Sequence, residues 1–559
     1  ISIELDFMCG IVGFSKFERS LSIDSNRLLD TLVHRGPDDQ NFYETDDIYL
    51  GHTRLSIVGI ADGRQPMHFD GLTLIFNGEI YNYKEIKKDL INQGYSFDTS
   101  SDTEVLLKAF HFWGKDFISK LNGMYAFVIF CNKTKKIFLA RDFFGIKPLY
   151  FCTRGTDILF SSEMMSLVSI FNSNNINFNL SSAAQKDYLK NGASNIPIIK
   201  DINELEKGKL FCLENGELTE IYSCSGTTNI DSADNLQHLL EKELDEQLNA
   251  DVEVGIMLSG GIDSSLLTAL SSKKIKNLKT FSIAFEEGKK FDESKYSRKV
   301  ANRFSTEHYE FKCTEDVMLS YLPKLIEALD APICDPAMLP TLYLSDKISE
   351  KVKVVLSGDG GDELFAGYTH HIVAHHKSLL NFAYNLIKFI PVFNEKKEIL
   401  RKLLKNNTSL ENQIDLDLNE GLNFKLLRKT DLCSMRFGIE VRVPYLSKRI
   451  FSYSKSKNIS SFIGLTKGKL PLRKLTEKLI DKEIAYKEKK GFRIPLKKWI
   501  VEGNLGSIVQ QDLNNHLLIS EDVITKSELN KVLANLDTFY QEAFSIYLLN
   551  NWIKKAKNI

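Results

Sequence analysis

VGIMLSGGIDSS, residues 254–265, is the stretch that decides the fold of the second half of this chain. Its apolar start predicts a buried strand that ends at Leu258, and Ser259, Gly260 and Gly261 then form a turn of small residues into a helix. Small residues let backbone N–H groups approach phosphate oxygens, and a helix N-terminus adds partial positive charge. The stretch therefore predicts a phosphate-binding loop. It lacks the lysine of GxxxxGK[ST], which excludes a Walker-type loop.

The same stretch adds the carboxylate of Asp263, which suits Mg²⁺, and the hydroxyl of Ser264. A second stretch, VVLSGDGGDELFAGY (354–368), also runs from a strand into a glycine-rich loop, and this loop holds three acids: Asp359, Asp362 and Glu363. Such acids repel one another unless a cation balances them. Taken singly, the two stretches could be a ligand-free turn and a solvated acidic loop, but together they favour metal and nucleotide binding.

The surroundings of these loops predict an α/β domain. TFSIAF (280–285) and VKVVLSG (352–358) are continuous apolar strands separated by helical segments, which is typical of a parallel sheet. An acidic helix, NLQHLLEKELDEQL (235–248), precedes them, and the chain beyond Lys377 is mostly helical in pattern. We therefore expect one α/β domain with a helical C-terminal part over residues 235–559.

The first part of the chain has a different pattern. MYAFVIF (124–130) and KIFLARD (136–142) predict a hairpin, and TLIFNGEI (73–80) predicts a strand that ends in an Asn-Gly turn. YKEIKKDLINQG (83–94) and DTEVLLKAFHFWG (102–114) have helical spacing. This mixture predicts an α+β layered domain over residues 9–170. Residues 171–234 are polar and turn-rich, so we expect a linker and domain junction there.

Composition excludes several partners. Lys and Arg number 72 against 73 Asp and Glu, so no bulk charge attracts nucleic acid or an anionic membrane. No apolar run is long enough to cross a bilayer. The eight cysteines have no metal-like spacing, and residues 1–8 lack the features of a secretory signal. We expect a cytoplasmic protein in which residues 1–8 are a leader or follow an upstream start.

The two loops resemble known signatures. SGGIDS (259–264) resembles the pyrophosphate-binding loop of the ATP pyrophosphatase fold, and SGDGGDELFAGY (357–368) is similar to a signature of the glutamine-hydrolysing asparagine synthetase family. DLCSMRFGIEVRVPYLS (431–447), KGKLPLRKL (467–475) and EKKGFRIPLKKW (488–499) resemble further signatures of that family.

This resemblance implies roles for individual residues. It implies Mg²⁺ binding by Asp263 and Asp362, help in acyl-adenylate formation from Asp359, where the family often has glutamate, and charge neutralisation by Lys469. The residues that it implies around ATP are Leu258, Ser259, Gly260, Gly261, Asp263, Ser264, Ile283, Ser357 and Gly358.

Near the start, MCGIVGF (8–14) places a cysteine directly after a methionine. If Met8 were the initiator, its removal would expose Cys9, whose α-amino group, with a pKa of roughly 7.7 to 8.0, could act as base to the thiol. A buried structural thiol is the alternative. HRGPDD (34–39), HTRLSIV (52–58), FNGEIYN (76–82) and SDTE (101–104) follow in order.

Together these motifs resemble the class II glutamine amidotransferase domain, an N-terminal-nucleophile αββα fold. The resemblance implies that Cys9 is the nucleophile and that Arg54 binds the glutamine carboxylate. It implies that Asp102 binds the amino group, that Glu79 also contacts glutamine, and that Asn77 with the Gly78 N–H forms the oxyanion hole. A peptide-bonded Cys9 has no free amine, so we expect translation to start at Met8 or the leader to be cut away.

The resemblance implies two coupled half-reactions. Glutamine hydrolysis would supply ammonia, and ATP would activate a carboxylate as its adenylate, with aspartate to asparagine as the leading acceptor reaction. A sugar uronic acid of surface polysaccharides is the alternative acceptor, and relatives that close β-lactam rings typically lack the cysteine. A non-catalytic relative and a plain amidohydrolase are further alternatives, although the latter leaves the second domain unexplained. An internal ammonia tunnel and a homodimer are family expectations.

Overall fold

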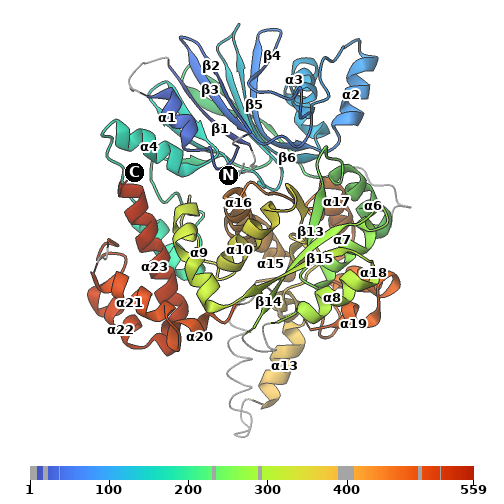
Figure 1. Ribbon diagram of the computed structural model, residues 1–559, viewed down its shortest axis with the longest axis vertical. Coiled ribbons are helices and arrows are strands. Elements are labelled where there is room, and N and C mark those ends of the chain that lie inside the picture. Colours follow the sequence, from blue (N-terminus) through green and yellow to red (C-terminus); the bar gives the residue numbers. More distant parts are fainter. Residues whose placement is uncertain are drawn as a thin grey trace.

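The computed structural model describes residues 9–16, 23–36, 38–228, 235–286, 292–387, 408–488, 494–515 and 518–558. The predicted leader (1–8) lies outside the described residues, as do the end of the predicted linker (229–234) and residues 489–493 of the last signature. Figure 1 shows a strand-rich N-terminal half above a second half in which helices surround a sheet.

Two antiparallel sheets form the N-terminal half. In spatial order, the first sheet consists of β10 (Asn203–Glu204), β8 (Tyr150–Arg154), β9 (Asp157–Ser161), β1 (Gly10–Ser15), β3 (Ile48–Arg54) and β2 (Asp39–Glu44). The second consists of β12 (Glu217–Ser223), β11 (Lys209–Glu214), β7 (Ile137–Arg141), β6 (Gly123–Cys131), β5 (Leu72–Ile80) and β4 (Met67–Phe69).

The two sheets pack face to face. Ile11 and Leu50 from the first sheet and Ile75 and Val128 from the second belong to one cluster and are fully buried. Each such side chain contributes about 1.5–3 kcal/mol of hydrophobic stabilisation. Helices cover the outer faces: α2 (Tyr83–Asn92), α3 (Asp102–Trp113) and the 3₁₀ turn η1 (Gly114–Lys120) on the second sheet, and α1 (Ser25–Asp30) and α4 (Met164–Ser173) on the first. The predicted layered α+β arrangement is therefore present.

Two details of the prediction are wrong. Asn77 and Gly78 do not form a turn, because β5 continues to Ile80 and pairs with β6 throughout. Residues 171–234 are not merely an irregular linker: β10 pairs with β8 and β11 pairs with β7, so this segment completes both sheets and also contains α5 (Ser182–Asn191). The polar composition misled because β10 and β12 of this segment lie at the sheet edges, and the side chains of β12 are largely exposed.

The second half is built on a parallel sheet, as predicted. Its spatial order is β15 (Glu307–Cys313), β14 (Lys279–Phe285), β13 (Val254–Met257), β16 (Val354–Leu356) and β17 (Glu440–Arg442), and every pair is parallel. Ligands of such sheets bind beyond the carboxyl ends of the strands, where both predicted loops lie.

Helices make up most of the rest of this half: some pack on the sheet, whereas others lie away from it (Figure 1). Up to α12 they are α6 (Leu236–Gln247), α7 (Ile262–Ser271), α8 (Ser294–Arg303), α9 (Glu315–Ala328), α10 (Met338–Ser349), α11 (Gly361–Leu364) and α12 (Thr369–His375). Next come α13 (Lys377–Ile387), α15 (Leu410–Leu416), the π-helix η3 (Asp417–Leu427), α16 (Arg428–Met435), α17 (Lys448–Ser456) and the 3₁₀ turn η4 (Ile459–Phe462). The remainder are α18 (Leu470–Leu479), α19 (Lys482–Tyr486), α20 (Leu496–Val501), α21 (Leu505–Asn515), α22 (Lys526–Ala534) and α23 (Leu536–Asn558).

The two halves share a buried core. Asp330, from the second half, accepts hydrogen bonds from the backbone N–H groups of Met164 and Met165, which begin α4 of the first half, at 2.9 and 2.7 Å. The Trp552 indole of α23 donates to the Asp330 carbonyl at 3.0 Å.

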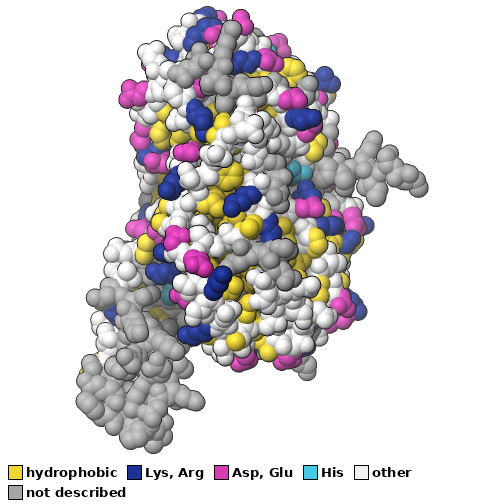
Figure 2. Space-filling model, turned by 90° about the vertical axis from the view of Figure 1, so that its left-hand side faces the viewer, with side chains coloured by type: hydrophobic (Ala, Val, Ile, Leu, Met, Phe, Trp, Pro, Cys, Tyr) yellow, Lys and Arg dark blue, Asp and Glu magenta, His cyan; other side chains and the backbone are white. Residues whose placement is uncertain are grey.

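Figure 2 shows basic and acidic side chains interspersed over one face, in keeping with the balanced charge. None of the helices in the described part of the chain could span a membrane.

Candidate active sites

The loops beyond β13 and β16 line a cavity of about 390 Å³. Nearly all residues predicted around ATP and metal lie in its wall: Leu258, Ser259, Gly261, Asp263, Ser264, Ile283, Ser357, Gly358, Asp359, Asp362 and Lys469. The N-terminus of α7 begins at this wall, because Gly261 is its N-cap. This cavity, named the nucleotide cavity for the ligand that the sequence predicts, therefore combines a helix N-terminus with carboxylates and with the ammonium groups of Lys429, Lys469 and Lys487.

Gly260 is the exception among the predicted ATP-binding residues, because it does not line the cavity. Its φ is +71°, and a Cβ there would lie 2.7 Å from the Ser297 backbone N and 2.8 Å from the Tyr296 Cβ. Glycine is thus required for the turn to pack against α8.

Lys469 lies between the two predicted metal ligands. Its Nζ is 2.6 Å from Asp263 Oδ2 and 2.8 Å from Asp362 Oδ1, and the residue is only 3% exposed. Burial alone would lower the pKa of this ammonium, but attraction to Asp263 and Asp362 outweighs burial and raises the pKa. The pair of carboxylates provides the oxygen ligands that Mg²⁺ prefers, so these residues fit the ion that the sequence predicts.

Each acid of the glycine-rich loop has its own partner. Asp362 contacts Lys469, Asp359 Oδ2 accepts from the Thr430 hydroxyl at 3.2 Å, and Glu363 Oε1 accepts from the Tyr368 hydroxyl at 2.5 Å. Burial, followed by the nearby Asp362, raises the pKa of Glu363 to about 7. The repulsion anticipated from the sequence is therefore relieved by one ammonium group and two hydroxyls.

Several polar residues of this wall were missed from the sequence. They are Glu293, Asp335, Lys429, Thr430, Arg473 and Lys487. Lys429 Nζ lies 3.6 Å from Asp335 Oδ2, and although burial lowers the pKa of Lys429, Asp335 and Asp359 together raise it. Lys429 and Thr430 directly precede the quoted signature that begins at Asp431, so extending that signature by two residues would have found them.

The first-half site is built on strand register. Cys9 directly precedes β1, whose Gly10 pairs with Thr53 of β3, so Cys9 lies opposite Arg54 at the sheet end. The Cys9 Sγ donates to the Leu55 carbonyl at 3.7 Å. Burial raises the pKa of this thiol to about 12, even though Arg54 opposes the shift. A base must therefore act on the thiol before it can serve as a nucleophile near neutral pH.

The predicted oxyanion-hole residues lie on β5. The Asn77 amide donates to the Ser162 hydroxyl at 3.4 Å, and its Oδ1 has no hydrogen-bond partner within the described residues. The same Ser162 hydroxyl accepts from the Ile11 N–H at 3.0 Å, which ties β5 to the strand that follows Cys9. Gly78 has a φ of +143°, and a Cβ there would lie 2.0 Å from the Met124 carbonyl oxygen. Only glycine permits this approach of β5 to β6.

The predicted glutamine-binding acids are buried and close to charges of the second half. Burial raises the pKa of Asp102 to about 6, although the Ile80 N–H donates to its Oδ2 at 2.9 Å. Burial and Asp102 raise the pKa of Glu79. Arg442 of β17 lies 3.8 Å from Glu79 Oε1 and 2.6 Å from Glu440 Oε1. The Glu-x-Arg part of the family signature therefore supports the first-half site rather than the nucleotide cavity.

Arg54, the predicted carboxylate-binding residue, is oriented by backbone carbonyls. Its Nη2 donates to the Gly59 carbonyl at 2.6 Å and its Nη1 donates to the Ile60 carbonyl at 3.1 Å. This guanidinium lies near enough to the thiol to be one of the charges that lower the Cys9 pKa. The structure thus brings Cys9 and Arg54 together at one end of the first sheet.

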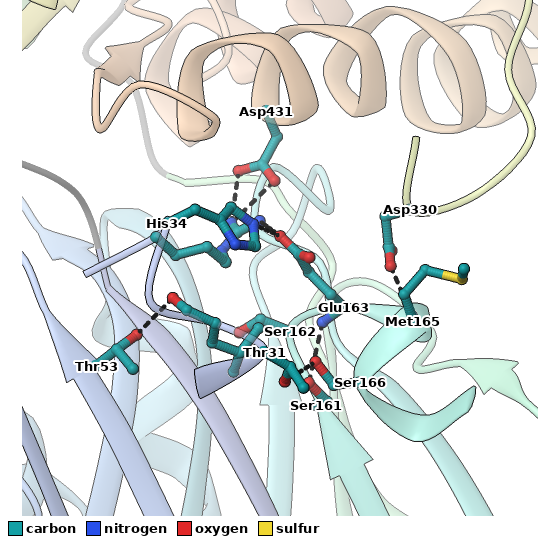
Figure 3. A network of polar contacts seen from close by, with 12 residues as sticks. Thr31, His34, Thr53, Ser161, Ser162, Glu163, Met165, Ser166, Asp330 and Asp431 are labelled. Atoms are coloured by element: carbon teal, nitrogen blue, oxygen red, sulfur yellow. Dashed lines mark hydrogen bonds and ion pairs between the residues drawn. The ribbon is translucent and has the colours of Figure 1, made fainter. Parts of the chain in front are cut away.

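A buried network joins the two halves (Figure 3). Asp431 reaches from α16 toward His34 and Glu163 of the first half. Fully buried Arg35 donates to Glu163 Oε1 and to Asp431 Oδ2, each at 2.9 Å, and to the Cys9 carbonyl at 3.5 Å. Because α16 also carries Lys429 and Thr430, one arginine links the neighbourhood of Cys9 to the wall of the nucleotide cavity.

Comparison with known proteins agrees with this two-site arrangement. Residues 8–223 match the glutamine amidotransferase domain, and residues 235–554 match the asparagine synthase family. Asparagine synthetase [glutamine-hydrolyzing] 1 of Bacillus subtilis (strain 168) is 30% identical over 569 aligned residues, which cover 88% of each chain. Asparagine synthetase B [glutamine-hydrolyzing] of Escherichia coli (strain K12) is 26% identical, over 87% of this chain and 82% of that relative. The chain therefore belongs to the glutamine-hydrolysing asparagine synthetase family, with a glutamine amidotransferase domain followed by an asparagine synthase domain.

Proposed function

We propose that this protein hydrolyses glutamine at Cys9 and transfers the ammonia to aspartate that has been adenylated by ATP, giving asparagine, AMP and pyrophosphate. The observation that carries the proposal is the pair of sites in one chain: a half-buried thiol beside Arg54, and a cavity in which Lys469 lies between Asp263 and Asp362. Either site could act by itself, but together ammonia production and carboxylate activation form an amide, which explains why both occur in one chain.

In the second half, the chain would hold the ATP phosphates at the N-terminus of α7, where Ser259, Gly261 and Ser264 meet. Mg²⁺ held by Asp263 and Asp362 would neutralise phosphate charge. Lys469 would add a positive charge that stabilises the transferred phosphoryl group and the adenylate, because it is buried and cannot be screened by water. Asp359, fixed by Thr430, would help the acceptor carboxylate attack.

In the first half, Arg54 would bind the glutamine carboxylate, and Asp102 and Glu79 would bind its amino group. The Asn77 amide and the Gly78 N–H would stabilise the oxyanion. The raised pKa of Cys9 requires a base, and we propose that the α-amino group of Cys9, exposed by removal of the preceding residues, is that base. Mass spectrometry of the active protein should then find Cys9 as its first residue.

The acceptor assignment rests on the charges beside Asp359. Lys429 and Asp335 form an ion pair at 3.6 Å in the cavity wall, so this wall can meet both the carboxylate and the ammonium of an amino acid. A sugar uronic acid has no ammonium for Asp335. The identity with asparagine synthetases along 88% of the chain supports the same acceptor.

An ATP–pyrophosphate exchange assay over candidate acids tests the acceptor. L-Aspartate should support exchange, and D335N should raise the KM for aspartate while leaving that for ATP unchanged. If aspartate gives no exchange and a nucleotide-linked uronic acid does, the aspartate assignment is wrong, although the amidotransferase assignment would stand.

A further inference from the structure

A second cavity, of about 500 Å³, opens where the two halves meet. Its wall combines the loop at Ser194–Ile198 and β10 of the N-terminal half with η3 and Arg428 of the second half. None of the residues assigned above to glutamine, ATP, metal or the acceptor lines it. The cavity has the size of a small-molecule site but belongs to neither half-reaction.

The charges of this interface cavity favour an anion. Glu204 lies between two arginines, with Oε1 3.0 Å from Arg141 Nη2 and Oε2 2.7 Å from Arg428 Nη2. Lys207 and Glu206 line the same wall, so three cations there stand against two carboxylates. Arg141 also donates to the Lys147, Leu205 and Gly145 carbonyls, so it is held in place, whereas within the described residues Arg428 donates to Glu204 alone and its remaining donors can bind a ligand.

A buried amide supplies a second, independent sign of a ligand. Asn423 of η3 is 8% exposed and lines the interface cavity, and its Oδ1 has no hydrogen-bond partner among the described residues. A buried polar atom without a partner is destabilising, so a ligand or water that supplies a donor is favoured. Asn195 and Asn203 add further amides to the wall.

The π-helix η3 connects the interface cavity to the nucleotide cavity, because it contributes residues to the walls of both. The π-helix η3 gives Asn419, Asn423 and Phe424 to the interface cavity and Leu426 to the nucleotide cavity. Its first residue, Asp417, lies 2.6 Å from the Nε2 atoms of both His370 and His371 of α12, beside the glycine-rich loop. π-Helices are rare and frequently mark functional positions.

Helix α16, which follows η3 in the chain, extends this connection to the glutamine site. A small neighbouring cavity shares Arg141, Glu204, Asn423 and Arg428 with the interface cavity and is also lined by Arg35 and Asp431. Arg428 and Asp431 belong to the same helix, α16, whose Asp431 binds Arg35 beside Cys9. A ligand bound to Arg428 could therefore shift α16 and alter the contact between Asp431 and Arg35 that joins the two halves.

We propose that the interface cavity bounded by Arg428, Asn423, Glu204 and the Ser194–Ile198 loop is an effector site for a small dicarboxylate, whose occupancy adjusts the coupling of glutamine hydrolysis to adenylation. One carboxylate of the ligand accepts from Arg428, and a donor of the ligand or of its bound water satisfies Asn423. The excess of one positive charge in the wall disfavours a cationic ligand.

Equilibrium dialysis tests this assignment with succinate and with L-glutamate, each radiolabelled. The full-length protein is first alkylated at Cys9 with a reactive glutamine analogue, so that the glutamine site is covalently filled. One dicarboxylate should bind per chain. R428M should weaken binding about ten- to a hundredfold, because it removes a hydrogen bond between charged groups. N419W, which fills the cavity from an exposed position without removing a charge, should also abolish binding, while R27M on an exposed surface should not alter it.

The functional readout is the ratio of glutamate formed to pyrophosphate released by the unmodified enzyme. Succinate should change this ratio in the wild type and in R27M but not in N419W, whose exchange activity without succinate should equal that of the wild type. If the alkylated protein binds neither probe, or if N419W binds succinate as the wild type does, the effector site is refuted.

Discussion

The two active sites of this chain are tuned by opposite means. In the first half, Cys9 directly precedes β1 and Asp102 begins α3, and burial sets their behaviour: it raises the pKa of the thiol to about 12 and that of the carboxyl to about 6. In the second half, Lys469 is also buried, but two aspartates pair with it and raise its pKa. The first site thus depends on proton transfer, whereas the second holds fixed charges ready for phosphate.

The largest expected effect separates the two half-reactions. C9A should lower the rate of glutamine-dependent amide formation by on the order of 10⁴-fold, because no other group can form the thioester. Aspartate-dependent ATP–pyrophosphate exchange should be unchanged, since Cys9 lies outside the nucleotide cavity. Both rates are measured on the same preparation. Undiminished glutamine-driven product in C9A would show that another nucleophile acts.

Lys469 gives the reciprocal test. K469M should lower pyrophosphate exchange by about 10²- to 10³-fold, because it removes a buried charge aimed at the phosphates and leaves Asp263 and Asp362 facing each other. Glutaminase activity should persist. K474M is the matched control, because Lys474 lies on α18, the helix that begins directly after Lys469, and its side chain is exposed. Equal losses in K469M and K474M would mean that α18 matters only for folding.

The buried network of Arg35, Glu163 and Asp431 should contribute to the stability of the fold. R35M leaves Glu163 and Asp431 buried without their shared cation, so it should lower the free energy of unfolding by about 3–5 kcal/mol. R27M, an arginine whose side chain is 86% exposed, should change it by less than about 0.5 kcal/mol. Urea titration followed by circular dichroism measures both. An R35M protein as stable as R27M would show that the network is not a structural bridge.

The same contrast explains what the sequence could predict. The second-half loops were found because each is contiguous: residues 259–264 and 357–368 carry their chemistry within one turn, and parallel strands bring the two loops to the same edge. In the first half, the sequence predicted a turn at Asn77 and Gly78, and this was wrong because only the pairing with β6 shows that the strand continues.

The contacts between the halves could not be predicted from the sequence. Arg442 reaches Glu79 and Arg35 reaches Asp431 across separations of hundreds of residues, and no local periodicity encodes such pairs. The segment 171–234 was misjudged for a related reason: edge strands such as β12 are half exposed and polar, so their membership of a sheet depends on a partner elsewhere in the chain.

The smallest expected effect concerns pH and rests on Asp102. Because burial raises its pKa to about 6, the carboxylate that would hold the glutamine ammonium becomes protonated as the pH falls from 7 to 5. Glutamine affinity should therefore fall about tenfold over this range. Calorimetric titration of C9A with glutamine measures binding free of the thiol and of turnover. D102N should bind weakly and without this pH dependence, whereas exchange by the second half should not follow it. Should C9A bind glutamine equally well at pH 7 and pH 5, burial does not set the behaviour of the first site, and the contrast between the halves fails.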